Sequence, residues 1–166
     1  MPEVNPIRLT HGYQGELVVF LIGMRFNKPW RPDLWLPVFM AMPRMLAELA
    51  RDPDSGFLGS RLSFTADGPM VVQYWSSQEL LYAYASKPDA EHRPAWTRFN
   101  AKARKAPGAV GIWHETYVVE RAESIYAHMK PVGLAVVTGA IPVGRRGERA
   151  AERLASSGSA SGQTAA

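Results

Sequence analysis

FLGSRLSFT-ADGP-MVVQYW, residues 57–75, predicts a β-hairpin in the middle of this chain. The two flanking runs, Phe57 to Thr65 and Met70 to Trp75, are rich in the aromatic and branched residues that pack well on a pleated sheet. Between them lies an Asp-Gly pair at 67–68, which favours the tight turns that join antiparallel strands. The middle of the chain is therefore expected to form two adjacent antiparallel strands.

Upstream of the hairpin, the chain predicts a strand and an interrupted helix. Glu16 to Phe26 is almost continuously apolar, which is typical of a strand that is covered on both faces. Arg31 to Arg51 carries apolar residues at helical spacing. Pro37 and Pro43 fall within it, and because proline removes a backbone donor we expect two helical segments or a kink.

Downstream, two helices and a last strand follow. Ser76 to Ala85 begins with the spacing of a capping box, Ser76 and Glu79. His92 to Lys105 is amphipathic, and Gly111 to Val119 predicts a buried strand. The order is close to β-α-β-β-α-β, so we expect an α+β protein with the ferredoxin-like plait.

The predicted sheet has one face covered by its helices, and its first strand suggests that the other face is apolar too. Packing two such faces together would give a homodimer, the arrangement called a dimeric α/β barrel. We expect residues 1–143 to form this single domain. Residues 144–166 are rich in Arg, Ala, Gly and Ser, which predicts a disordered basic tail.

Composition narrows the function classes. The chain has 166 residues, a net charge of +4 and no cysteine, so disulfides, thiolate metal sites and a cysteine nucleophile are excluded. Its longest apolar run, Leu17 to Met24, is far shorter than the ~20 residues of a membrane helix, and no signal peptide is expected. No basic stripe is interleaved with aromatic residues, which argues against nucleic-acid binding. We expect a soluble, cytoplasmic protein.

The strand from Gly111 to Tyr117 holds the strongest functional candidate. Alternation places Ile112, His114 and Thr116 on one face and Trp113, Glu115 and Tyr117 on the other. Burying either polar group without a partner would cost about 1–3 kcal/mol. His114 is therefore either a hydrogen-bonded core histidine or a general base or substrate anchor.

Further candidates lie in the other strands and helices. Arg25 and Gln73 are polar residues in apolar strands, where they would stabilise developing negative charge. For Arg25 the alternatives are a salt bridge to Glu115 or an anionic ligand. Aromatic residues would line the substrate pocket or pack in the core; they are Tyr74, Trp75, Trp96, Phe99 and Trp113.

Motifs of the common enzyme classes are absent from the sequence. It contains no glycine-rich phosphate loop, dinucleotide fingerprint, helical pair of metal-binding histidines or nucleophile elbow. With four histidines and no cysteine, a closed zinc site is not expected. We expect His11 and His92 to be exposed, and His128 lies in a segment whose structure the pattern does not predict.

Several segments, in this order, resemble a bacterial and fungal family known as a domain of unknown function (DUF4188) or as monooxygenase-like. Its fungal relatives include the small monooxygenase of the fumagillin pathway. The resemblance extends from about Phe20 to Val143. The matching segments are Phe20–Arg25, Trp35–Pro37, Ala41–Pro43, Gly56–Gly59, Gln73–Trp75, Pro94–Asn100 and Gly111–Tyr117.

This resemblance implies a dimeric α/β barrel related to the antibiotic-biosynthesis monooxygenases. Some members of that superfamily oxidise polyketide-like aromatics without a cofactor, while others bind haem and either degrade it or dehydrate aldoximes. It thus implies a small oxygenase for an apolar, aromatic or polyketide-like molecule, with His114 as base or anchor. No histidine follows Trp75 at the short spacing of the haem degraders.

Two alternatives stay open. The first is a haem protein of the same fold, an aldoxime-dehydratase-like enzyme or a sensor, with His114 or His128 as the axial ligand. The second is a binding protein that holds a small molecule without converting it. All three functions share the expected partners, which are a small molecule and a second copy of the chain.

Overall fold

The main sheet contains β2 (Leu17–Phe26), β3 (Phe57–Thr65), β4 (Gly68–Trp75) and β5 (Val110–Val119). Its strands lie in the order β3-β4-β2-β5, so the first and third strands of the motif are central. Helices connect β2 to β3 and β4 to β5. This is the predicted α+β ferredoxin-like plait, confirmed here in a computed structural model that describes residues 6–87, 92–144 and 147–157.

The central hairpin forms as the sequence predicts. β3 and β4 pair antiparallel from Phe57 opposite Trp75 to Thr65 opposite Gly68. The Thr65 hydroxyl accepts from the Asp67 backbone N–H at 3.2 Å and donates to the Gly68 carbonyl at 2.9 Å, which closes the turn. Gly68 has a φ of 127°, and a Cβ there would collide with the Met24 carbonyl, so the turn requires glycine.

The helical segment between β2 and β3 is divided in two, as predicted, although Pro37 lies inside the first helix and not at the break. α1 (Pro32–Phe39) and α2 (Ala41–Leu49) meet at Met40, and Pro43 falls in the first turn of α2, where its missing N–H has no partner to lose. A short 3₁₀ turn (Pro53–Ser55) follows α2.

α3 (Gln78–Ser86) and α4 (His92–Lys105) occupy the predicted ranges. The N-cap of α3 is Ser77, whose hydroxyl accepts from the Leu80 N–H at 3.2 Å, so the expected cap at Ser76 is wrong by one residue. Within the described residues, every helix falls short of the length and apolar character needed to cross a bilayer.

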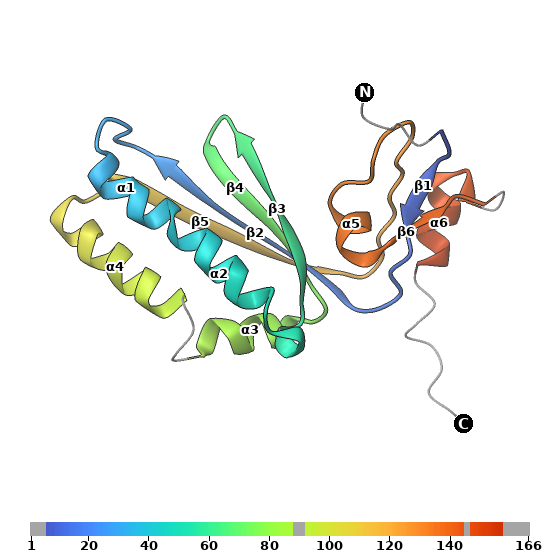
Figure 1. Ribbon diagram of the computed structural model, residues 1–166, viewed down its shortest axis with the longest axis horizontal. Helices are drawn as coiled ribbons and strands as arrows, with labels where there is room; N and C mark the ends of the chain where they lie inside the picture. The colour runs from blue at the N-terminus through green and yellow to red at the C-terminus, as the bar shows by residue number, and fades with distance from the viewer. Residues whose placement is uncertain (1–5, 88–91, 145–146, 158–166) are drawn as a thin grey trace. The chain divides into compact units, whose positions relative to one another are not determined.

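The core lies between one face of the sheet and the helices. Val18 and Trp75 from the sheet pack with Leu49 of α2 and Leu81 of α3. Phe20, Phe57 and Tyr84 pack around this cluster. Figure 1 shows α1 to α4 gathered on this side of the sheet, which we call the helix face. The side chains between these positions in each strand, such as Leu21 and Val72, point to the opposite side of the sheet, which we call the outer face.

β5 is an edge strand, and the expectation that it is buried is wrong. His114, Glu115, Tyr117 and Val118 are all exposed. The sequence of a strand does not show whether the strand lies at the edge or in the centre of a sheet. The physical difference is the missing neighbour on one side.

The chain divides into two compact units, and the plait is the unit Val18–Tyr117. The other unit combines Met1–Leu17 with Val118–Ala166. It contains β1 (Leu9–His11), α5 (Leu134–Thr138), β6 (Ala140–Pro142) and α6 (Ala150–Ser156). β1 pairs antiparallel with β6, and Leu9 packs with Tyr126 and Ala135.

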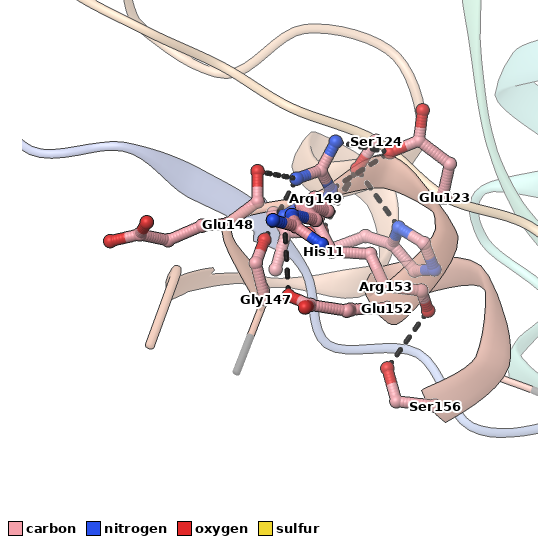
Figure 2. A network of polar contacts seen from close by, with 10 residues as sticks. His11, Glu123, Ser124, Gly147, Glu148, Arg149, Glu152, Arg153 and Ser156 are labelled. Carbon is pink, nitrogen blue, oxygen red and sulfur yellow. Dashed lines mark hydrogen bonds and ion pairs between the residues drawn. The ribbon is translucent and has the colours of Figure 1, made fainter. Parts of the chain in front are cut away.

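The described part of the segment predicted as a disordered tail contains a helix. In α6, Arg153 is 9% exposed, and its guanidinium contacts Glu123 at 2.8 Å. The same group donates to the carbonyls of Gly147 and Glu148, at 2.8 and 3.1 Å (Figure 2). The composition of the segment does not predict this helix, because the acidic partner of Arg153 lies 30 residues away in the sequence. Residues 158–166 lie outside the described residues.

Candidate functional site

Gln73 and Trp75 place polar atoms in the middle of the helix face. Both lie on the central strand β4, and Gln73 is opposite Phe20 of β2. Trp75 is fully buried and Gln73 is 5% exposed. Two-residue spacing puts both side chains on the same face as the core. The polar ends of these residues are therefore shielded from solvent.

A hydrogen bond fixes the direction of the Gln73 amide. The Trp75 indole N–H donates to Gln73 Oε1 at 3.0 Å. An indole nitrogen only donates, so the oxygen of the amide must face Trp75 and the NH₂ group must face away. That NH₂ group lies 3.9 Å from the sulfur of Met42 in α2.

The Gln73 NH₂ group is poorly satisfied. Among the residues that the structure describes, the Met42 thioether is its one hydrogen-bond partner. A thioether is a weak acceptor, and a buried donor without a good partner costs about 1–3 kcal/mol. Such groups in a native fold are commonly explained by a bound water or ligand. This donor is the strongest chemical feature of the helix face.

His114 joins the same face from β5. Its ring centroid lies 5.6 Å from that of Phe20, at an interplanar angle of 35°. Because Phe20 is also opposite Gln73, the three side chains form a row across neighbouring strands: Gln73, Phe20 and His114. His114 is exposed, so solvent or a ligand can reach its imidazole. We call this row the candidate site.

Aromatic rings form the wall beside the candidate site. The Phe57 ring lies 5.5 Å from Trp75, and the Tyr84 ring lies 6.0 Å from it. The Tyr84 hydroxyl donates to the Glu48 carboxylate at 2.8 Å, which ties α3 to α2. The polar atoms of the wall are both hydrogen-bonded, the Trp75 N–H to Gln73 and the Tyr84 hydroxyl to Glu48.

Three predicted site residues lie on the outer face instead. Alternation along the strands turns their side chains away from the face that carries Gln73 and His114. These residues are Arg25, Tyr74 and Trp113. The indole of Trp113 covers Gly23, where a Cβ would lie 2.5 Å from the ring. Glycine at position 23 therefore makes room for this indole. The predicted separation of His114 from its neighbours Trp113 and Glu115 is confirmed.

The expected salt bridge between Arg25 and Glu115 is wrong. Arg25 pairs with Asp67 of the hairpin turn at 2.6 Å, and both side chains are largely exposed. Glu115 instead accepts a hydrogen bond from the Tyr117 hydroxyl at 2.7 Å, which raises the pKa of Tyr117. The turn brings Asp67 to Arg25 because it folds back over the end of β2, and exposed pairs of this kind contribute little stability.

Trp96 and Phe99 lie together on α4, outside the candidate row. Their rings stack at 5.3 Å, and Trp96 is 55% exposed. Phe99 lines a small apolar pocket with a volume of about 10 Å³. That is room for about one water molecule. The other lining residues come from α1, the end of α4, the turn that follows it and the start of β5: Leu34, Val38, Ala103, Ala106, Ala109 and Val110.

The pocket beside Phe99 does not fit haem. A porphyrin is far larger than the pocket beside Phe99. His114 and His128 belong to different compact units, and His128 is exposed with a φ of 55°. Groups of at least three His, Cys, Asp or Glu side chains able to hold a metal are also absent from the described residues.

His11 is a polar residue whose burial the sequence did not reveal. It is 8% exposed, so the expectation of a surface residue is wrong. Its Nδ1 lies 2.9 Å from the Ser124 hydroxyl, which also accepts from the His11 backbone N–H at 3.0 Å (Figure 2). Burial lowers the pKa of His11, and the Glu123 charge partly opposes that shift. Its partner is 113 residues away, and no local pattern points to it.

The sequence of this chain is similar to those of known proteins. The family model described as Monooxygenase af470-like matches residues 17–134. Monooxygenase af470 of Aspergillus fumigatus is 28% identical over 141 residues, which cover 74% of this chain and 48% of that protein. The chain thus spans about half the length of this curated relative.

Among solved structures, similar folds are found at low sequence identity. SnoaB, a cofactor-independent oxygenase from Streptomyces nogalater, has 15% identity and a TM-score of 0.46, over 65% of this chain and 97% of SnoaB. A dimeric ferredoxin-like protein of unknown function from Jannaschia sp. CCS1 has 17% identity and a TM-score of 0.43, over 60% and 97%.

Proposed function

This chain belongs to the Monooxygenase af470-like family, and on that premise we propose that it is a small oxygenase that works without a bound cofactor. Its substrate is an apolar, aromatic or polyketide-like molecule that carries an acidic C–H conjugated with a carbonyl. The observation that carries the proposal is the row Gln73, Phe20 and His114, which sets a directed N–H donor and an accessible imidazole in apolar surroundings.

The chemistry needs a base and an oxyanion partner. The substrate lies over the Phe20 ring, and His114 removes the proton from carbon. The electron pair moves onto the carbonyl oxygen, where the Gln73 NH₂ group donates a hydrogen bond to the developing negative charge. Apolar walls exclude water and strengthen that bond.

Dioxygen then reacts with the carbanion carbon to form a C–O bond, giving a peroxide that takes the proton back from the His114 imidazolium. Loss of water from the peroxide leaves a new carbonyl. One oxygen atom ends in the product and one in water, and the substrate's C–H bonds supply all the electrons. The balance therefore requires no external reductant, and no step passes through haem.

Anthrone tests this function, because it is a three-ring ketone with an acidic CH₂ group. We expect the purified protein to consume one O₂ per anthrone and to form anthraquinone, measured with an oxygen electrode and by chromatography. The control is heat-denatured protein at the same concentration, since anthrone also oxidises slowly by itself. Binding of anthrone without faster oxygen uptake would contradict the proposal and favour the non-enzymatic binding function.

The protein acts as a homodimer in this proposal, with the outer faces of two sheets packed together. The outer face carries Leu21, Val72 and Trp113, and it lacks the helical cover that the other side has. Leu21 and Trp113 are partly exposed, and Val72 is buried beside them. An apolar sheet face without helical cover is typical of a protein-binding surface. Two-fold symmetry lets the same surface cover itself.

We expect Leu21→Asp to convert the dimer to monomers, because it places a charge in the middle of the outer face. Light scattering coupled to size exclusion measures the mass. Leu62→Asp is the matched control, since Leu62 pairs with Val71 on the neighbouring strand and therefore points to the helix face, where it is half exposed. An unchanged mass in Leu21→Asp, or an equal loss of the dimer in both variants, would rule out this interface.

A further inference from the structure

We infer that Trp75 is a positioning residue, which holds the Gln73 amide so that the helix face has a subsite for an acceptor oxygen of the ligand. This inference rests on the proposed function and deepens it. A fully buried indole is often only core packing, but this one also hydrogen-bonds the side chain beside it. The bond decides which end of the amide faces α2.

The two ends of a side-chain amide have similar shapes, but the oxygen accepts hydrogen bonds and the NH₂ group donates them. With Oε1 held by the indole N–H at 3.0 Å, the group left for a ligand is a pure donor. A carbonyl or an ionised oxygen fits it, whereas a group that can only donate leaves two donors facing each other. Trp75 therefore sets the specificity of the subsite for ketone and enolate oxygens without touching the ligand.

Met42 occupies the place of that oxygen in the free protein. Its sulfur lies 3.9 Å from Gln73 Nε2, at the outer limit of such contacts. A methionine side chain is unbranched and adopts new rotamers easily. A ligand oxygen would displace the sulfur and form a shorter, stronger hydrogen bond with the same N–H. The contact with sulfur thus gives the buried Gln73 donor a weak partner in the free protein. The donor stays available for a ligand oxygen.

The test compares two ligands of the same shape. 9-Fluorenone is a three-ring ketone that has no acidic C–H to react, and fluorene lacks the oxygen. We expect the wild-type protein to bind fluorenone about tenfold more tightly than fluorene in equilibrium dialysis, as for a buried donor that gains its acceptor. The ratio of the two affinities reports the hydrogen bond, because damage to packing weakens both ligands together.

Three variants test how this affinity ratio depends on the amide donor, on its orientation and on the competing sulfur. Gln73→Met keeps the length of the side chain and removes the donor, and we expect the ratio to fall to about one. Trp75→Phe keeps an aromatic ring and frees the amide to rotate, and we expect a ratio of about three. Met42→Leu removes the competing sulfur, and the ratio should stay at tenfold or rise.

A wild-type protein that does not prefer fluorenone, whether both ligands bind or neither does, overturns the inference. A ratio that stays at tenfold in Trp75→Phe overturns the role of Trp75, and the same ratio in Gln73→Met overturns the subsite. Dialysis under argon keeps the outcome independent of turnover, since fluorenone has no C–H that could react and the CH₂ group of fluorene cannot be oxidised without dioxygen. Preference for fluorenone without oxygen uptake on anthrone would refute the proposed function alone.

Discussion

His114→Ala is expected to lower the rate of anthrone oxidation by about 10²–10⁴-fold, which is the usual contribution of a positioned general base. The imidazole is exposed and its ring contact is with Phe20, so its removal opens no cavity in the core. Stability and oligomeric state should therefore stay as they are. Oxygen uptake gives the rate, and thermal unfolding followed by circular dichroism verifies the fold.

His128→Ala is the matched control for this experiment. It removes another exposed imidazole, and His128 lies in the unit that does not contain the candidate site. We expect its rate to equal that of the unmodified protein. Full activity in His114→Ala would remove His114 from the mechanism, and the proton would then need another acceptor.

The fold could be predicted because its signals are local. The Asp-Gly turn, the proline in the first turn of α2 and the apolar first strand each depend on a few neighbouring residues. Pro43 marks the start of α2 because proline is accepted only in the first turn of a helix without loss of a hydrogen bond. These signals determine the element order, and the order determines the plait.

The site could be predicted only in part, since it depends on contacts between distant residues. Alternation correctly separates His114 from Glu115, but whether a strand lies at the edge of a sheet depends on which strands pair with it. The partner of Arg25 is Asp67, 42 residues away and brought close by a turn. Arg153 and Glu123 also lie far apart in the sequence, and their ion pair holds the helix found in the segment predicted as a tail.

Neither Gln73 nor Trp75 reveals its role by sequence position alone. Their two-residue spacing on a strand places them on one face, which the sequence does predict. That the indole bonds the amide and leaves the NH₂ group facing a sulfur depends on side-chain torsions and on the packing of α2. Both residues were candidates from their chemistry, and only the structure relates one to the other.

Trp75→Ala is expected to lower the free energy of unfolding by about 3–5 kcal/mol, the usual cost of truncating a buried large aromatic residue. Trp75 is fully buried between the rings of Phe57 and Tyr84. Removing it leaves a cavity at the centre of the helix-face core. It also leaves Gln73 Oε1 without its donor, which adds to the loss.

Urea unfolding followed by far-ultraviolet circular dichroism measures this loss as a lower midpoint at an unchanged slope. Trp96→Ala is the control, because it removes the same side chain from an exposed position on α4 and should cost less than about 1 kcal/mol. Trp75→Phe separates the two contributions to the loss. It restores most of the ring volume but not the hydrogen bond, so its stability should lie between those of the alanine variant and the unmodified protein. If Trp75→Ala cost no more than Trp96→Ala, Trp75 would not be the centre of this core, and the rigid indole that orients Gln73 would have no support.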